Sequence, residues 1–466
     1  MPWRDLAEPV RMQRVALVAP ATALRAMLVE VADAGTVELE RPGERARPTT
    51  AGHPARLARE PADPAALEAA GRSDLLAGEH ELTTYARAAV LRGEVAALAG
   101  WTPATELPGL GSRLAPVGGA VVPLAPPRGI DPPTLLRDGG TARRSFTPLV
   151  ETYGTVPYAD VDPTVVAAGA YMLMFGMMFG DAGHGLLLVL AGLLIRAGRP
   201  AALARLRRVW PFVVGAGLFA VGFGVLYGEF FGPTGVLPVL WVSPLDEPLT
   251  LLAVALGVGA VLLAVAQGIG TVNRWREGGW AFALSSASGV AGAALLAGLG
   301  VVVLGAVGEQ GRLVGVGVVV MVAGVVLAFL GFLAASGGGG AGVTQAAVEV
   351  FDAVLRLGTN LVSFARLAAF GLTHAALGMV VWDGTTTLAG AGTLGVVGAV
   401  VLFVVGNAVT FTLEALVAGV QALRLEYYEL FSRIFTGEGR AFRPWHVPLD
   451  GVEPGGDTPP VPRSSP

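Results

Sequence analysis

One apolar run carries two ionisable side chains at positions where membrane helices rarely hold them. The stretch "NLVSFARLAAFGLTHAALGMVVW", residues 360–382, is long enough to cross a bilayer, and it contains Arg366 and His374. Arg366 lies about ten residues from either polar end of its segment, which is roughly 15 Å along a helix. An arginine at mid-helix costs about 2.5–3.5 kcal/mol on insertion scales. A buried carboxylate or water must therefore compensate this charge, either in an ion path or in a structural ion pair.

A matching polar stripe follows in the last apolar run, residues 393–432. Glu414, Gln421 and Arg424 fall on one broad face of a helix there, and Glu414 lies well inside the run. Two helices that both hold buried ionisable groups are typical of an ion path. The alternative is that Glu414 and Arg366 simply neutralise each other. The charges beyond this stripe are interpreted as an ordinary interfacial cluster, namely Glu426, Glu429 and Arg433.

The stretch "FGMMFGDAGHG" places Asp181 and His184 three residues apart. Such a pair binds a metal ion only with further ligands, and the other histidines are scattered along the chain. We therefore predict a polar corner between two helices at this point, and neither a metal site nor a cofactor. Gln267 and Asn273 lie in another apolar run and are expected to form hydrogen bonds between helices.

The composition indicates a protein that crosses the lipid bilayer several times. Of the 466 residues, 53% are hydrophobic and 15% are charged, and the mean hydropathy is +0.61. The chain has no cysteine and no lysine. These absences exclude disulfides, thiolate metal sites and a phosphate-binding P-loop, so we expect no nucleotide site in this chain. Nothing in the sequence suggests a nucleic-acid partner.

Residues 1–160 are polar and predict a small cytoplasmic α/β domain. Its first half reads as a strand, a helix closed by Gly35 and a second strand. The expected elements are strand 13–20, helix 21–35, strand 36–41, a loop over 41–80, an amphipathic helix over 85–100, and a strand followed by proline-rich turns within 116–136.

Residues 161–446 predict a transmembrane domain, and residues 447–466 predict a disordered tail. Eight apolar segments are expected: 163–179, 183–197, 209–231, 249–273, 280–306, 313–335, 352–382 and 393–432. The first two are short and would count as one if they formed a single kinked segment. Arginines gather before the first segment and after the second, fourth and eighth, so the positive-inside rule places both termini in the cytoplasm of a multi-pass cell-membrane protein.

Four separated motifs resemble one known family. "YGTVPYADVDPT", "FGMMFGDAGHG", "SFARLAAFGLTHAAL" and "LEALVAGVQALRLEYYELFSRIFTGEGRAFRPW" are similar, in order, to motifs of the membrane stator subunit of V-type and A-type rotary ATPases, called subunit a or subunit I. The resemblance covers residues from about 145 to 445. It implies a mainly α-helical polytopic fold with about eight transmembrane helices, the last two long and tilted, behind a small N-terminal cytoplasmic α/β domain.

The resemblance also implies a function and a set of site residues. In that family the subunit forms the proton or sodium path beside a rotating ring of proteolipid subunits, and it catalyses no reaction itself. Further partners implied are peripheral-stalk subunits and the central stalk or ATPase head. The positions that match the family's ion-translocating residues are Arg366, Arg424, Glu414, His374, Gln421 and Glu429.

The chain departs from the family pattern in its cytoplasmic part. Only about 60 residues separate strand 36–41 from the motif "GWTPATELPGL", where the family has an extended helical arm. A short or missing arm predicts weakened docking of the peripheral stalks. Two other hypotheses remain open: a secondary transporter with an intramembrane Arg–Glu pair, and a non-transporting assembly protein derived from a stator.

Overall fold

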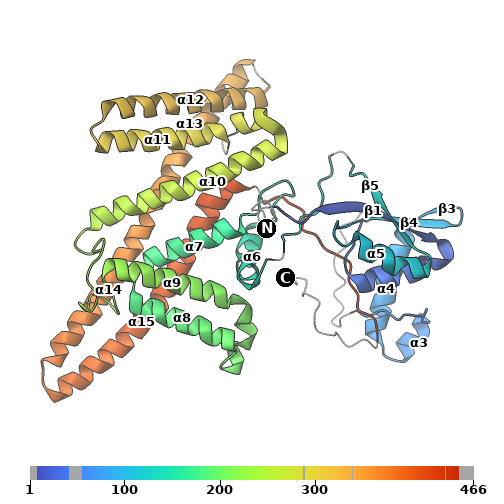
Figure 1. Cartoon of the computed structure of the whole chain (residues 1–466), viewed down its shortest axis with the longest axis horizontal. Coiled ribbons are helices and arrows are strands. Elements are labelled where there is room, and N and C mark those ends of the chain that lie inside the picture. The colour runs from blue at the N-terminus through green and yellow to red at the C-terminus, as the bar shows by residue number, and fades with distance from the viewer. Residues whose placement is uncertain are drawn as a thin grey trace. The chain divides into compact units, whose positions relative to one another are not determined.

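The computed structural model describes residues 8–40, 55–127, 129–137, 139–286, 289–337, 339–435 and 437–450 (Figure 1). The chain divides into two compact units. The helical unit comprises Leu136–Gly439 together with the N-terminal residues up to Glu8, and the sheet unit comprises Pro9–Leu135 together with the residues from Arg440 onward. The boundary between the units at residue 136 lies earlier than the boundary at residue 160 expected from composition.

The sheet unit is an antiparallel sheet with helices packed on it. Its strand order is β2-β4-β1-β5, and β3 pairs with β4. The predicted strand, helix and strand at its start are confirmed, and the helix ends at Gly35, which has φ +59° as a left-handed helix cap requires. The elements are β1 Met12–Pro20, α2 Leu24–Ala34, β2 Glu38–Leu39, α3 Pro64–Ala69, α4 Ser73–Ala88, β3 Val90–Arg92, β4 Val95–Pro103, α5 Leu107–Leu114 and β5 Ala120–Leu124.

Two local predictions in this unit are wrong. The expected helix over residues 85–100 is instead the end of α4 followed by β3 and β4, which turn at Gly93 with φ +60°. Pairing of β4 with β1 over nine residues, from Met12 opposite Pro103 to Pro20 opposite Val95, overrides the local helix pattern. The expected loop over 41–80 contains α3 and the start of α4, while residues 41–54 lie outside the described residues.

The segment after the last apolar helix folds into the sheet unit. Val447 and Leu449 are buried in its core, and the ring of Trp445 lies 4.4 Å from that of Tyr85 between centroids. Leu449 forms a parallel bridge with Leu57. The chain is therefore folded to Asp450, four residues into the segment expected as a disordered tail, and residues 451–466 lie outside the described part.

The helical unit contains the apolar helices. Among the described residues, six helical stretches are long and apolar enough to cross a membrane, and α7 and α8 are shorter apolar helices. The elements of this unit are α6 Thr141–Tyr153, α7 Thr164–Met178, α8 Ala182–Ala197, η3 Ala201–Val209, α9 Trp210–Tyr227, α10 Pro248–Ser285, α11 Val290–Val307, α12 Gly311–Ala335, α13 Gly339–Ser363, α14 Ala365–Ala389, α15 Thr393–Leu425, η4 Glu426–Phe431 and α16 Ser432–Ile434.

The first two apolar segments are separate helices rather than one kinked helix. The chain leaves α7 at Met178 and begins α8 at Ala182. α8 then packs closely along α9, because glycines let their backbones approach. A Cβ atom on Gly224 of α9 would lie 2.0 Å from the backbone nitrogen of Ala182, whereas a Cβ on Gly222 would meet no atom within 4 Å.

The last two apolar segments are long and contain irregular turns. The expected segment 352–382 is longer, because α13 and α14 together run from Gly339 to Ala389 with a break at Phe364. Phe364 is fully buried against Gly259 of α10, where a Cβ would lie 2.3 Å from the phenylalanine ring. α14 and α15 pack together and cross the other apolar helices obliquely in Figure 1. Their tilt in a bilayer stays a prediction.

The loop that leads into α7 holds a buried acidic group. Asn273 of α10 accepts a hydrogen bond from the Val161 amide at 2.9 Å and donates one to the Ile434 carbonyl at 2.9 Å, which joins this loop to the end of the helical unit. Asp160 beside it is fully buried. Burial and the nearby Glu277 raise the pKa of Asp160 to about 7, against the opposing effect of neighbouring arginines.

Replacing Gly224 by alanine should destabilise the helical unit by about 1–3 kcal/mol, because the new methyl group collides with backbone that cannot move aside. Gly222→Ala is the matched control on the same helix and should be neutral or slightly stabilising. Thermal unfolding in detergent checks both variants. Equal melting temperatures for the two would contradict the described packing of α8 on α9.

Asp160→Asn should gain stability relative to the wild type as pH rises. The folded chain keeps the Asp160 proton up to about pH 7, whereas the unfolded chain loses it near the ordinary pKa of 3.8. Rising pH between these values therefore destabilises the wild type but not the variant. Unfolding measured between about pH 5 and about pH 8 should show the difference growing in favour of Asp160→Asn. A constant difference would refute the burial of this group.

Candidate functional site

The helix break at Phe364 fixes the side chain of Arg366. The Leu367 amide bonds to the Phe364 carbonyl at 2.9 Å instead of continuing the regular helical pattern. This leaves the Ser363 carbonyl as an acceptor, and Arg366 Nε donates to it at 3.0 Å. Part of the guanidinium's hydrogen-bonding capacity is thus satisfied by backbone from its own break, where an unbroken helix would offer no such carbonyl.

The charge of Arg366 is partly balanced by Glu429. Nη2 of Arg366 lies 3.3 Å from Oε1 of Glu429, and the two side chains are 22% and 7% exposed. Glu429 lies in η4, a π-helical turn of the kind that often occurs at functional sites. With its amide nitrogen turned toward Glu429, Asn360 donates to Oε2 at 3.1 Å and accepts from Arg433 at 3.0 Å.

The interpretation of the charges after Arg424 as an ordinary interfacial cluster needs correction. Glu426 is 1% exposed and Glu429 is buried, so neither is a solvated surface charge. Arg433 donates to Gln267 Oε1 at 3.1 Å, and Gln267 Nε2 donates to the Gly289 carbonyl at 3.1 Å. These residues form a buried network that holds Glu429 beside Arg366.

Arg366 keeps one open side. It lines a groove of about 550 Å³ along α13, together with seven other residues: Val354, Leu355, Gly358, Thr359, Val362, Ser363 and Ala365. The lining is mostly apolar, apart from the arginine and two hydroxyl groups. Arg366 is therefore paired with an acid on one side and faces an open apolar groove on the other.

Two further predicted site residues lie near this arginine without a strong partner. Arg424 is close enough for its charge to act on Arg366, and it makes no ion pair within the described part of the chain. Gln421 is half-buried, and its side-chain oxygen has no hydrogen-bond partner among the described residues. The structure thus gathers Arg366, Arg424 and Glu429 at one end of the candidate site.

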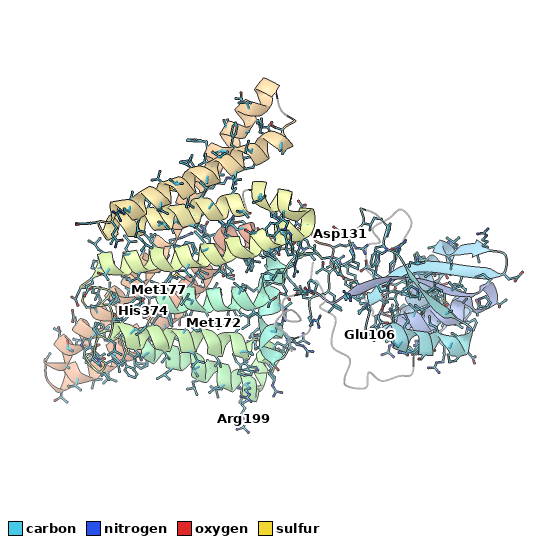
Figure 2. All side chains as sticks on the ribbon, turned by 45° about the horizontal axis from the view of Figure 1, so that its top comes forward. Glu106, Asp131, Met172, Met177, Arg199 and His374 are labelled. Atoms are coloured by element: carbon cyan, nitrogen blue, oxygen red, sulfur yellow. The ribbon has the colours of Figure 1, made fainter. Side chains whose placement is uncertain are left out.

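His374 and Glu414 form a second, separate pair. His374 Nδ1 contacts Glu414 Oε2, and both residues are buried, at 3% and 8% exposure. The alternative that Glu414 neutralises Arg366 is therefore wrong, because each has its own partner. The side chain of His374 lies among the helices of this unit, as does Met177 of α7 (Figure 2).

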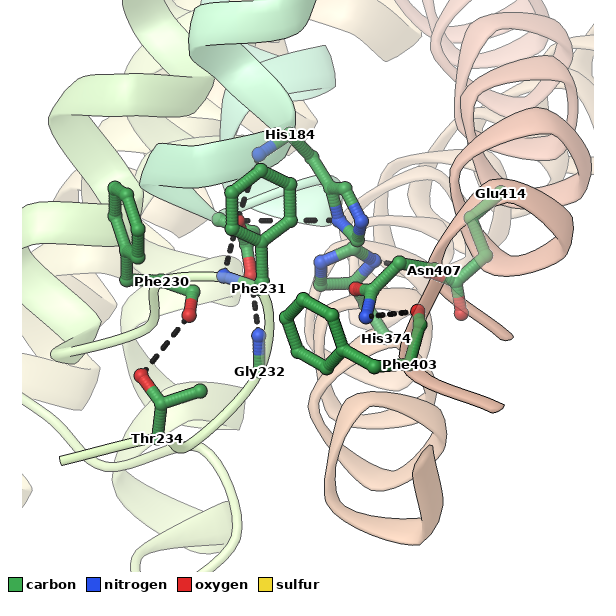
Figure 3. Close-up of polar contacts among 10 residues, drawn as sticks. His184, Phe230, Phe231, Gly232, Thr234, His374, Phe403, Asn407 and Glu414 are labelled. Carbon is green, nitrogen blue, oxygen red and sulfur yellow. Dashed lines mark hydrogen bonds and ion pairs between the residues drawn. The ribbon is translucent and has the colours of Figure 1, made fainter. Parts of the chain in front are cut away.

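Asp181 fastens the start of α8 to the loop after α9. Its carboxylate accepts hydrogen bonds from the amides of His184 at 2.8 Å, Phe231 at 3.0 Å and Gly232 at 2.7 Å (Figure 3). The ring of His184 lies 5.5 Å from the ring of His374 between centroids. The corner at Asp181 thus adjoins the second pair.

Sequence reasoning missed two residues of this second group. Glu229 is 4% exposed, and one of its carboxylate oxygens has no hydrogen-bond partner in the described structure. Asn407 is 8% exposed and lies beside the two histidines in Figure 3. A polar residue at the end of one apolar run and another inside the last run are the signals that identify them.

The fold and the site define a polytopic membrane protein whose ionisable side chains are paired between apolar helices. The chain belongs to the V-type ATPase 116kDa subunit family, which matches residues 93–237 and 343–447. It is similar to A-type ATP synthase subunit I of Pyrococcus horikoshii, with 27% identity over 64% of this chain and 45% of that protein.

Two other relatives extend the comparison. A-type ATP synthase subunit I of Halobacterium salinarum is 30% identical over 68% of this chain and 52% of that protein. V-type ATP synthase subunit I 2 of Treponema pallidum is 38% identical over 33% of this chain and 35% of that protein. The chain spans about half the length of the curated relatives it matches.

The pair of Arg366 and Glu429 should show energetic coupling. Each alanine variant leaves its partner's charge without compensation, so the double variant should lose less stability than the two single losses added, by about 1–3 kcal/mol. Arg356 and Asp352 are the matched control, because they are exposed and should couple by only about 0.3–0.5 kcal/mol. Unfolding free energies in detergent measure both cycles. Coupling no larger than in the control pair would refute the pairing.

Proposed function

We propose that this chain is the membrane stator subunit of a rotary V-type or A-type ATPase or ATP synthase. In this role it forms two half-channels for protons or sodium ions against a proteolipid rotor ring, and it holds no nucleotide site of its own. The observation that carries the proposal is the open side of Arg366, a buried arginine that faces a groove on the surface of the helical unit. The relatives named as subunit I of ATP synthases support it.

The groove explains how an arginine can act on a passing carboxylate. A ring carboxylate in lipid holds its ion, because desolvation disfavours the charged form. Beside Arg366 the opposite charge favours the carboxylate, with an attraction of about 4 kcal/mol at about 4 Å and an effective dielectric constant near 20. This attraction is large enough to make the arriving site release its ion.

Glu429 is the resting partner of Arg366 in this mechanism. At 3.3 Å its contact is loose for a charge-assisted hydrogen bond, which is ordinarily about 2.7–2.9 Å. A ring carboxylate that enters the groove can therefore exchange places with Glu429 at little energetic cost. Arginine stays charged throughout, so it also blocks ions from passing directly between the half-channels.

The two polar groups suit two different half-channels. Arg366 and His374 are eight residues apart on α14, which separates them by about 12 Å along the helix. We assign Glu429, Gln421 and Arg424 to the end near Arg366. The pair of His374 and Glu414 belongs to the other half-channel, where it relays protons or holds water. This assignment places both termini in the cytoplasm of a cell-membrane protein.

A second candidate function is an assembly protein derived from a stator, with no transport of its own. The observation that favours it is the length of the chain, about half that of its curated relatives. The partners separate the two functions. A translocating stator purifies with a proteolipid ring, peripheral-stalk subunits and the central stalk or ATPase head, whereas an assembly protein leaves the finished complex.

Arg366→Ala should abolish ATP-driven ion transport in vesicles while the complex still assembles. Arg366→Lys should also lose most transport, because an ammonium group cannot keep the Ser363 contact and the outward-facing charge together, and it can lose its proton. Arg312→Ala, at an exposed position of α12, is the control and should transport normally. Acidification or sodium uptake measures all three. Normal transport by Arg366→Ala would overturn the proposed function.

A further inference from the structure

Three metal-ligating side chains meet in the second polar group. Asp181 and His184 come from the start of α8, and His374 comes from α14. All three are buried, and their ligand atoms lie within 4.8 Å of one another. The third ligand was absent from the sequence argument because 190 residues separate the two histidines. The structure supplies the further ligand that the pair of Asp181 and His184 lacked.

His184 has no hydrogen-bonding role in the described structure. Its side chain is 1% exposed, and neither ring nitrogen has a hydrogen-bond partner among the described residues. The ring is enclosed by the rings of Phe179, Phe231 and Phe411, with centroids 5.3–5.8 Å away. Buried polar groups almost always have partners, so an imidazole with two free nitrogens needs an explanation. A bound cation provides one.

His374 is oriented as a metal ligand ordinarily is. Its Nδ1 contacts the carboxylate of Glu414, so Nε2 is the nitrogen left for an ion. A carboxylate on one imidazole nitrogen and a metal on the other is the usual arrangement around zinc, because the carboxylate fixes the tautomer and strengthens the ligand. Glu414 thus has the position of a residue that supports a ligand.

Asp181 retains capacity for one more partner. A carboxylate offers about four lone-pair positions, and three backbone amides occupy three of them. The same amides hold the carboxylate rigidly in place. Glu229, buried and with one oxygen lacking a partner among the described residues, lies close enough for its charge to act on His374. Its carboxylate adds to the negative charge that favours a cation.

We propose that Asp181, His184 and His374 form a binding site for a divalent transition-metal cation of the zinc type. Two imidazole nitrogens and one carboxylate oxygen form a typical three-ligand zinc set, which leaves a fourth position for water or Glu229. Hard cations such as Mg²⁺ prefer oxygen ligands and are excluded by the two imidazoles. Ligand atoms around tetrahedral zinc are about 3.4 Å apart, so small side-chain rotations close the site.

A bound ion would also affect transport. It would occupy the free nitrogen of His374 and so remove that residue from proton exchange, a consequence that rests on the proposed function. Metal binding itself does not depend on that function. The Arg366→Ala protein should therefore bind the metal as the wild type does, so that the two proposals fail separately.

The test uses Co²⁺ and Zn²⁺ on the purified chain, carried on an affinity tag without histidine. Visible absorption of Co²⁺ and calorimetry with Zn²⁺ should show one ion bound per chain in a tetrahedral site. His184→Asn and His374→Asn should each weaken binding by at least about 100-fold. His80→Asn, which removes an exposed histidine of α4, is the matched control and should bind as the wild type does.

A wild type that binds no more tightly than His184→Asn, or an equal loss in His80→Asn, would overturn the site. X-ray absorption of the zinc-loaded wild type answers the question even where a variant fails to fold. Two imidazoles and an oxygen shell support the proposal, and a shell of oxygen alone contradicts it.

Discussion

The contact on which the candidate site depends is the one between Arg366 and the carbonyl group that the helix break releases. A charged guanidinium inside apolar helices needs hydrogen-bond acceptors, and an unbroken helix consumes its own carbonyls. The break at Phe364 frees the carbonyl of Ser363, and Arg366 Nε uses it. The remaining nitrogens are then free for an acid, either Glu429 or a carboxylate of another subunit. The break makes the buried charge tolerable without fixing it permanently to one partner.

Other features of the helical unit support this arrangement. Phe364 can turn inward because Gly259 of α10 leaves room for its ring. Glu429 reaches Arg366 from the π-helical turn that follows α15. Asn273 holds the loop before α7 to the end of the chain's helical part. Small residues and irregular backbone therefore position the charges, while the long regular helices supply the apolar surroundings.

The sequence predicted much of this architecture and several of its demands. Apolar runs located α9, α12 and α15 closely, and the cost of a buried charge showed that Arg366 and Glu414 each need a partner. Which partners they have was not predictable, because Arg366 and Glu429 are 63 residues apart and any acid in the last helix satisfied the same argument. The helix predicted over 85–100 failed for a similar reason, since its strand forms by pairing with β1, about 80 residues earlier in the sequence. The proximity of His184 to His374 likewise has no local signal.

Cross-linking tests the central claim most directly, because the chain has no cysteine of its own. Val362→Cys places a single thiol in the groove beside Arg366, and a second thiol is placed beside the carboxylate of a proteolipid ring subunit. The account predicts that mild oxidation joins the two chains and stops transport, whereas Val319→Cys on the exposed face of α12 gives no such product. A cross-link from Val319→Cys in place of Val362→Cys would contradict the account, because the ring would then pass a face of the protein that Arg366 does not reach.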